Sequence, residues 1–244
     1  MIPNSNRLKS LDFCPQLQSY FSEGKAFGRS GRTFDKLGAL STINNLLILR
    51  NLMRELKPKN TLEIGMCFGA SALTIASMHG ELGERPEAQH IAIDPFQQEC
   101  WDDAALVALE KAGLRGYVEL RQNFSGIVLP ELWEQKHQVQ LAYIDGSHLF
   151  EDVFIDCYYV VRLLSEGGVM ALDDSSDPHV QKVVRFLRND MSAHLEEVDL
   201  NRYRETPRHP LLNRLARKLG RLQMTAFRRI GTTSRSWDAP FINF

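Results

Sequence analysis

The sequence lacks the features of several protein classes. Its only cysteines, Cys14, Cys67, Cys100 and Cys157, form no C-x-x-C pair, so they predict neither a zinc site nor a disulfide framework. No stretch approaches the roughly 18 uninterrupted apolar residues of a membrane span. The first residues, MIPNSNRLKSLDF, do not show the basic-then-apolar pattern of a signal peptide. We therefore expect a cytoplasmic protein without an integral membrane segment.

Strong overall charge is also absent, because the net charge is only -1. The charge is unevenly distributed: residues 201–244 carry ten Arg or Lys against two acids. With an overall pI of about 6.7 and no RNA-binding signature, the sequence does not predict a nucleic-acid partner. The basic segment instead predicts a solvated sheet edge, a contact in a homo-oligomer or a groove for an acidic substrate. Its short helix, with Arg214, Arg217, Lys218 and Arg221, could also touch an anionic membrane surface weakly.

Short apolar runs alternate with helical patterns along the chain. We predict strands at 61–64, 90–93, 117–121, 139–144 and 169–172, and helices at 42–55, 70–78, 101–112, 127–135, 150–164 and 179–189. Gly167 and Gly168 are expected to separate the 150–164 helix from the fifth strand. The tail adds expected strands at 195–201 and 223–230 around a helix at 211–219. This alternation predicts a doubly wound, Rossmann-like α/β fold with a seven-stranded, mostly parallel sheet and an antiparallel closing strand.

Acidic residues stand at or near the ends of four of these strands. Glu63 precedes a glycine turn, Asp94 and Asp145 each end a strand, and Asp173 with Asp174 ends another. Open α/β sheets bind ligands outside the carboxyl ends of their strands. Five carboxylates on one rim repel each other unless something cationic or rich in donors lies among them. The sequence therefore predicts a ligand site at this edge.

The glycine turn distinguishes between nucleotide classes. It runs Glu63-Ile-Gly65-Met-Cys67-Phe-Gly69, so Cys67 occupies the middle glycine position of the dinucleotide fingerprint G-x-G-x-x-G. Glu63 would also repel a diphosphate, which disfavours a nicotinamide dinucleotide. A ligand with an ammonium and a sulfonium group suits the turn better. Asp94 is placed to accept hydrogen bonds from the ribose hydroxyls of such an adenosine ligand.

Four stretches resemble a known family. TLEIGMCFGASALTIA and IAIDPF look like the first two motifs of class I S-adenosylmethionine (SAM) dependent methyltransferases. YIDGSH and LLSEGGVMALDDSS are similar to the small-molecule O-methyltransferase branch that includes catechol, caffeoyl-CoA and antibiotic-sugar enzymes. The similarity covers roughly residues 35–190. It implies SAM as cofactor and the following cofactor-binding residues: Glu63, Gly65, Cys67, Gly69, Ser71, Asp94, Asn123 and Asp145.

The same resemblance implies a metal site and a base. Metal-dependent members hold a divalent cation at positions matching Asp145, Asp173 and Asp174, and these oxygen ligands suit Mg²⁺. His148 stands where catechol-type relatives carry a lysine base, and an ordinary histidine pKa of about 6.5 suits proton removal near neutrality. The alternatives are that Asp145 contacts only the SAM amine, that Asp173 or Asp174 caps the helix beginning near Pro178, and that His148 is a plain loop residue.

The sequence thus predicts a SAM-dependent O-methyltransferase that moves a methyl group to a hydroxyl of a small molecule, a natural product or sugar, assisted by a divalent metal. Asp145 and His148 are its expected catalytic residues. The alternatives are a metal-independent small-molecule methyltransferase and a non-catalytic SAM-fold binding or scaffold subunit. We expect an N-terminal segment at 1–40, in which 21–35 is a lid or a plain connector, a SAM-binding core at 41–200, and a basic segment at 201–244 that completes the sheet edge.

Overall fold

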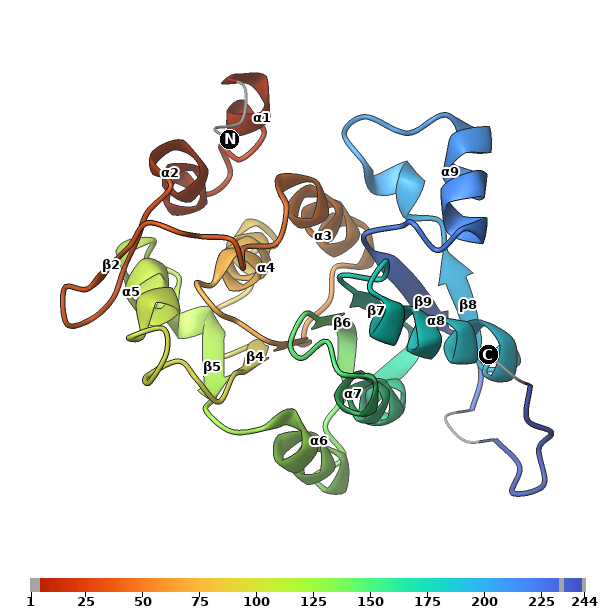
Figure 1. Ribbon diagram of the computed structural model, residues 1–244. Coiled ribbons are helices and arrows are strands. Elements are labelled where there is room, and N and C mark those ends of the chain that lie inside the picture. The colour runs from red at the N-terminus through yellow and green to blue at the C-terminus, as the bar shows by residue number, and fades with distance from the viewer. Residues whose placement is uncertain (1–4, 233–234, 243–244) are drawn as a thin grey trace.

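A seven-stranded sheet forms the centre of the molecule (Figure 1). The computed structural model describes residues 5–232 and 235–242. In spatial order the strands are β5 (Val118–Arg121), β4 (His90–Ile93), β3 (Thr61–Ile64), β6 (Val139–Ile144), β7 (Leu164–Leu172), β9 (Thr225–Arg229) and β8 (Leu195–Val198). The first five are mutually parallel, whereas β9 is antiparallel to both of its neighbours. The predicted fold class, including the antiparallel closing strand, is confirmed.

Helices cover both faces of the sheet. The longer ones are α2 (Pro15–Glu23), α3 (Ile43–Leu56), α4 (Ala70–Glu81), α5 (Ala104–Lys111), α6 (Ser125–Glu134), α7 (Phe150–Leu163), α8 (Pro178–Asp190) and α9 (Pro210–Lys218). Shorter elements are α1 (Ser5–Lys9), η1 (Arg115–Tyr117), η2 (Leu200–Tyr203), and the hairpin of β1 (Ala26–Phe27) and β2 (Thr33–Phe34). None of the helices in these ranges is long and apolar enough to cross a membrane.

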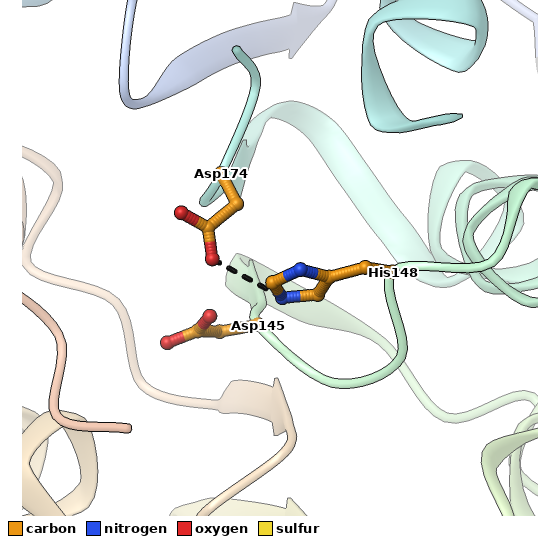
Figure 2. Close-up of side chains that lie close together, drawn as sticks. All are labelled: Asp145, His148 and Asp174. Carbon is orange, nitrogen blue, oxygen red and sulfur yellow. Dashed lines mark ion pairs between the residues drawn. The ribbon is translucent and has the colours of Figure 1, made fainter. Parts of the chain in front are cut away.

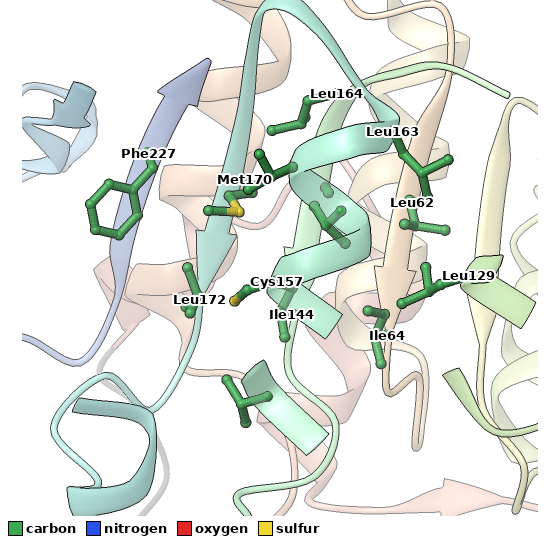
Figure 3. Packing of buried hydrophobic residues seen from close by; sticks show 14 of the residues in the cluster. Leu62, Ile64, Leu129, Ile144, Cys157, Leu163, Leu164, Met170, Leu172 and Phe227 are labelled. Carbon is green, nitrogen blue, oxygen red and sulfur yellow. The ribbon is translucent and has the colours of Figure 1, made fainter. Parts of the chain in front are cut away.

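Alternation of side chains along each strand assigns residues to the two faces. Leu62, Ile64 and Ile144 point into a core shared with α6, α7 and α8, which Figure 3 shows from close by. Their neighbours Leu141 and Tyr143 face the opposite side, where α3 and α4 pack. Every residue of β3 is buried, as expected for a central strand of a parallel sheet covered on both faces.

Local signals explain where the helices next to the strand ends begin. The Thr42 side chain accepts a hydrogen bond from the Asn45 backbone N–H and so caps α3. Asp177 caps α8 in the same way through the His179 N–H. The alternative that Asp173 or Asp174 caps this helix is therefore wrong, and both acids are left for other contacts.

Element boundaries differ from expectation mainly in β7. The strand begins at Leu164, directly after α7, and continues through Gly167 and Gly168, so these glycines do not separate helix from strand. Its register with β6 shifts after Val139, and Gly167 adopts a φ of +77° within the irregularity. The tail strand is shorter than predicted, because residues 200–203 form the 3₁₀-helix η2.

Candidate active site

A cavity of about 850 Å³ opens at the carboxyl ends of β3, β4, β6 and β7. Its walls come from residues 38–42, 64–65, 67, 93–96, 101, 124–126, 145–148, 152, 173–174 and 223. The segments that follow these four strands and β5 therefore meet one segment that precedes α3 and one residue, Gln223, that precedes β9. This is the edge at which the sequence predicts a ligand.

The turn after β3 depends on glycine at Gly65. This residue has a φ of +84°, and an added Cβ would lie 2.2 Å from the backbone oxygen of Asp145. Gly65 thus lets the turn after β3 approach the end of β6. Cys67 in the same turn lines the cavity, and burial raises the pKa of its thiol to about 12. The thiol therefore stays protonated and is no nucleophile at neutral pH.

Asp94 joins the glycine turn to the end of β4. Its Oδ2 accepts hydrogen bonds from the backbone N–H groups of Met66 at 3.1 Å and Cys67 at 2.8 Å, and from Gln97 Nε2 at 2.9 Å. Its Oδ1 accepts from the Phe96 N–H at 2.8 Å. Asp94 lines the cavity although only 4% of it is exposed. Since Oδ1 has one donor, it retains acceptor capacity for a ligand.

A buried network lies beneath the ends of β6 and β7. Ser41 Oγ donates to Asp145 Oδ2 at 2.8 Å, and Asn45 Nδ2 donates to Asp173 Oδ1 at 2.8 Å. The hydroxyl of fully buried Tyr143 donates to Asp173 and lies 3.3 Å from Asp145 Oδ2. Burial, followed by the charge of Asp173, raises the pKa of Asp145; burial likewise raises the pKa of Asp173. A cation nearby would stabilise both carboxylates.

Three side chains converge on the open side of this network. One potential ligand atom from each of Asp145, His148 and Asp174 lies within 4.8 Å of the others (Figure 2). His148 Nε2 is 3.1 Å from Asp174 Oδ2, and Gln223 donates to the other oxygen of Asp174. The expected set of Asp145, Asp173 and Asp174 is therefore not the one that converges. Asp173 lines the cavity, but its carboxylate is held by Tyr143 and Asn45.

Other expected cofactor residues lie outside the cavity wall. Glu63 is fully buried in β3, where its Oε1 is 3.2 Å from His90 Nε2. Ser71 is buried in the first turn of α4, and Gly69, with a φ of +81°, precedes that helix. Asn123 is exposed and accepts a hydrogen bond from the Phe124 N–H. Of the expected cofactor residues, Gly65, Cys67, Asp94 and Asp145 line the cavity.

The chain resembles known proteins both in sequence and in fold. The sequence family described as "Methyltransferase domain" matches residues 62–175. This match spans β3 to the end of β7 and includes the glycine turn, Asp94, Asp145 and Asp174. The chain therefore carries a methyltransferase domain over residues 62–175. No curated protein sequence matches the chain.

Solved structures share the fold of this methyltransferase. The O-methyltransferase TomG of Streptomyces achromogenes, involved in tomaymycin synthesis and solved with SAM, is 15% identical, with a TM-score of 0.61 over 95% of this chain and 92% of its own. A Bacillus cereus O-methyltransferase solved with SAH is 15% identical, with a TM-score of 0.59 over 95% and 93%. A TDP-rhamnose 3'-O-methyltransferase of calicheamicin biosynthesis is 20% identical, with a TM-score of 0.55 over 77% and 79%.

Several cavity residues of the methyltransferase were missed from the sequence. Phe96 and Phe124 form an edge-to-face pair with ring centroids 5.9 Å apart, and the two residues are 43% and 58% exposed. Ser41 reaches Asp145 from the segment before α3, and Gln223 reaches Asp174 from the tail. Phe96 could have been found, because it lies two residues after the acid of β4. Ser41 and Gln223 carry no local signal.

Proposed function

We propose that this methyltransferase transfers the methyl group of SAM to a hydroxyl oxygen of a small molecule. The observation that carries the proposal is the charge of the cavity. Among the described residues that line it, five are carboxylic acids and none is lysine or arginine; the acids are Asp94, Asp145, Asp152, Asp173 and Asp174. SAM brings a sulfonium and an ammonium cation, whereas a pyrophosphate would find five acids and no balancing cation.

The cavity residues suit three parts of SAM: the ribose, the methionine part and the adenine ring. Asp94 Oδ1 has acceptor capacity for a ribose hydroxyl, and Gly65 with Cys67 would lie beneath the methionine part. Phe96 and Phe124 offer exposed aromatic surface for the adenine ring. Glu63, Gly69 and Ser71 would act indirectly, by shaping the turn and the start of α4.

His148 supports the proposed removal of the acceptor proton. It is half-exposed beside the cavity, and its Nε2 lies 3.1 Å from Asp174 Oδ2. An imidazole held by a carboxylate is oriented and is stabilised once it has taken up a proton. Asp174 is itself fixed by the Gln223 amide. In this arrangement His148 is the base and Asp174 is its positioning residue.

A divalent metal is the second part of the proposal. Asp145, His148 and Asp174 together offer carboxylate oxygen and imidazole nitrogen donors, which suit Mn²⁺ as well as the expected Mg²⁺. A metal bound there would lower the pKa of an acceptor hydroxyl and orient it. His148 keeps its role as base in the metal-assisted reaction if the carboxylates of Asp145 and Asp174 hold the ion, because an imidazole that binds a metal cannot also take up the proton. The metal-independent alternative assigns His148 to the proton alone.

Cofactor binding tests the first part of the proposal. We expect calorimetry to show that SAM binds and NAD does not, and that Asp94→Ala weakens SAM binding at least tenfold because a charge-assisted hydrogen bond is lost. NAD binding without SAM binding would refute the proposal. Methyl transfer from radiolabelled SAM into a panel of small hydroxyl compounds would then exclude the scaffold alternative.

Metal binding is tested separately, with Mn²⁺ as the probe in an electron paramagnetic resonance titration. Asp174→Ala should weaken Mn²⁺ binding and turnover at least tenfold while changing the Kd for SAM less than about twofold. Asp152→Asn is the matched control, since it removes a cavity carboxylate outside the converging group. Full turnover in EDTA would contradict the metal, and a pH–rate profile that His148→Ala leaves unchanged would contradict the base.

A further inference from the structure

Helix α9 exposes its apolar side chains to solvent, whereas an ordinary surface helix buries them. None of its residues is buried, and its leucines face solvent: Leu211, Leu212, Leu215 and Leu219, the last at its C-cap, are 69%, 63%, 52% and 53% exposed. Its contacts with the body of the protein are polar instead. Asn213 donates to Asp199 at 3.3 Å, and Arg217 pairs with Glu197 at 2.6 Å. A surface helix normally buries its apolar stripe, so this stripe lacks its partner.

Free cations flank the leucine stripe. Arg214 and Lys218 lie one helical turn apart on the side next to Leu211 and Leu215, and Arg221 follows just beyond the helix. Among the described residues, no hydrogen bond or ion pair from these three side chains is formed, whereas Arg217 is paired with Glu197. Two acids lie next to α9 and already have partners on the helix: Glu197 pairs with Arg217, and Asp199 accepts a hydrogen bond from Asn213. The exposed face is therefore both apolar and cationic.

We infer that α9 docks on the anionic surface of a lipid bilayer. An interfacial helix buries its apolar stripe at the boundary between headgroups and acyl chains, while flanking Arg and Lys side chains contact lipid phosphates. Leu211, Leu215 and Leu219 supply the stripe, and Arg214 and Lys218 supply the flanking charges. Figure 1 shows α9 at the outer edge of the molecule, beside β8, where a flat surface can approach it.

The geometry favours lipid over a second copy of the chain. A nine-residue helix is only about 14 Å long and 10–12 Å wide, so by itself it provides much less than the roughly 800 Å² per partner of a stable interface. A two-fold symmetric contact through α9 would also bring Arg214 and Lys218 of one copy towards the same cations of the other. An anionic bilayer offers opposite charge over an unlimited area.

Vesicle co-sedimentation of the full chain tests the inference. We expect binding to vesicles of phosphatidylcholine with phosphatidylglycerol, and none to phosphatidylcholine alone. Leu215→Ser with Leu219→Ser should weaken binding about tenfold or more, since two apolar side chains no longer insert. Arg214→Glu with Lys218→Glu should weaken it roughly 25-fold or more, because each cation near an anionic surface contributes about fivefold.

Two matched controls separate α9 from the rest of the surface. Ile155→Ser removes an apolar side chain that is 41% exposed on α7, and Lys25→Glu with Lys136→Glu makes the same change in net charge on exposed lysines elsewhere. Both should bind vesicles as the unmodified chain does. Absence of binding to anionic vesicles would overturn the inference, as would leucine variants that bind normally. A dimer in sedimentation that Leu215→Ser converts to monomer would assign the stripe to a second copy instead.

Discussion

Asp156 is a buried carboxyl group whose protonation bears on the stability of the whole chain. It lies on α7, only 1% exposed, and burial raises its pKa to about 7, with the charge of Asp152 adding to the effect and a hydrogen bond from Ser125 opposing it. An aspartate in the unfolded chain has a pKa of about 3.9. Between about pH 4 and 7 the unfolded chain therefore releases a proton that the folded protein keeps, and stability falls as the pH rises.

Asp156→Asn should remove this loss of stability at rising pH. We expect the variant to exceed the unmodified protein in free energy of unfolding by up to roughly 4 kcal/mol at pH 8, with the gain shrinking towards zero near pH 4. Urea unfolding at several pH values measures it. Glu151→Gln, in the first turn of α7 and exposed, is the control for a lost charge. An equal gain at pH 5 and pH 8 would show that ionisation of Asp156 is not the cause.

The success of sequence reasoning at single residues depended on where each side chain points. Asp94 and Asp145 follow the last residue of a parallel strand, and such strands end at one edge, so both line the cavity as predicted. Glu63 lies within β3, on the same face as Thr61, and therefore points towards His90 under α4. The alternation of side chains along the strand could have shown that Glu63 points away from the cavity. The hydrogen bond from Tyr143 to Asp173 could not be predicted, since it depends on how closely β6 and β7 pack.

Side chains at and within α5 hold the β1–β2 hairpin in place, and Asp102 makes most of the hydrogen bonds. Asp102 accepts hydrogen bonds from the Ser30 hydroxyl at 2.6 Å and from the Ser30 N–H at 3.1 Å, and its own backbone oxygen accepts from the Arg29 N–H at 2.7 Å. Arg29 adds ion pairs with Asp103 and Glu110. The segment that the sequence left open as lid or connector is thus an ordered hairpin with a defined attachment.

Asp102→Gly should release the hairpin without straining the backbone. Asp102 has a φ of +50°, which glycine adopts freely, so the change removes the side chain and leaves the backbone oxygen that accepts from the Arg29 N–H. We expect trypsin to cleave after Arg29 and Arg32, in the hairpin loop, several-fold faster than in the unmodified protein, because cleavage follows the population of the opened segment. Glu99→Ala, a nearby exposed acid, is the control. Unchanged cleavage would mean that the ion pairs of Arg29 suffice.

Among the elements, long periodic segments were predicted well and irregular ones were not. The α3 helix was expected at 42–55 and occupies Ile43–Leu56, because apolar spacing, the Thr42 cap and Pro58 agree. The early start of β7 was missed, since two adjacent glycines usually mark a loop. Here the irregular pairing with β6 accommodates them. The two-residue strands β1 and β2 are too short to leave a period.

For the molecule as a whole, strand order determines how the basic tail contributes. The sequence predicted a closing strand pair at the sheet edge, and β9 and β8 form it, with β9 between β7 and β8. Phe227 and Ala226 of β9 are buried in the core, and the chain just before β9 brings Gln223 to Asp174. The tail is therefore part of both core and cavity. The expected boundaries at residues 40 and 200 remain a prediction.

Truncation tests whether the tail is integral. A chain ending at residue 222 loses β9, which leaves β8 without a neighbour and uncovers the edge of β7. We expect it to show no cooperative thermal transition by circular dichroism, because a whole inner strand with its buried Phe227 is missing. A chain ending at residue 232 keeps β9 and should lose no more than about 2 kcal/mol of unfolding free energy. Cooperative unfolding of the shorter chain would instead show that residues up to 222 fold on their own, and that the tail only docks on a finished sheet.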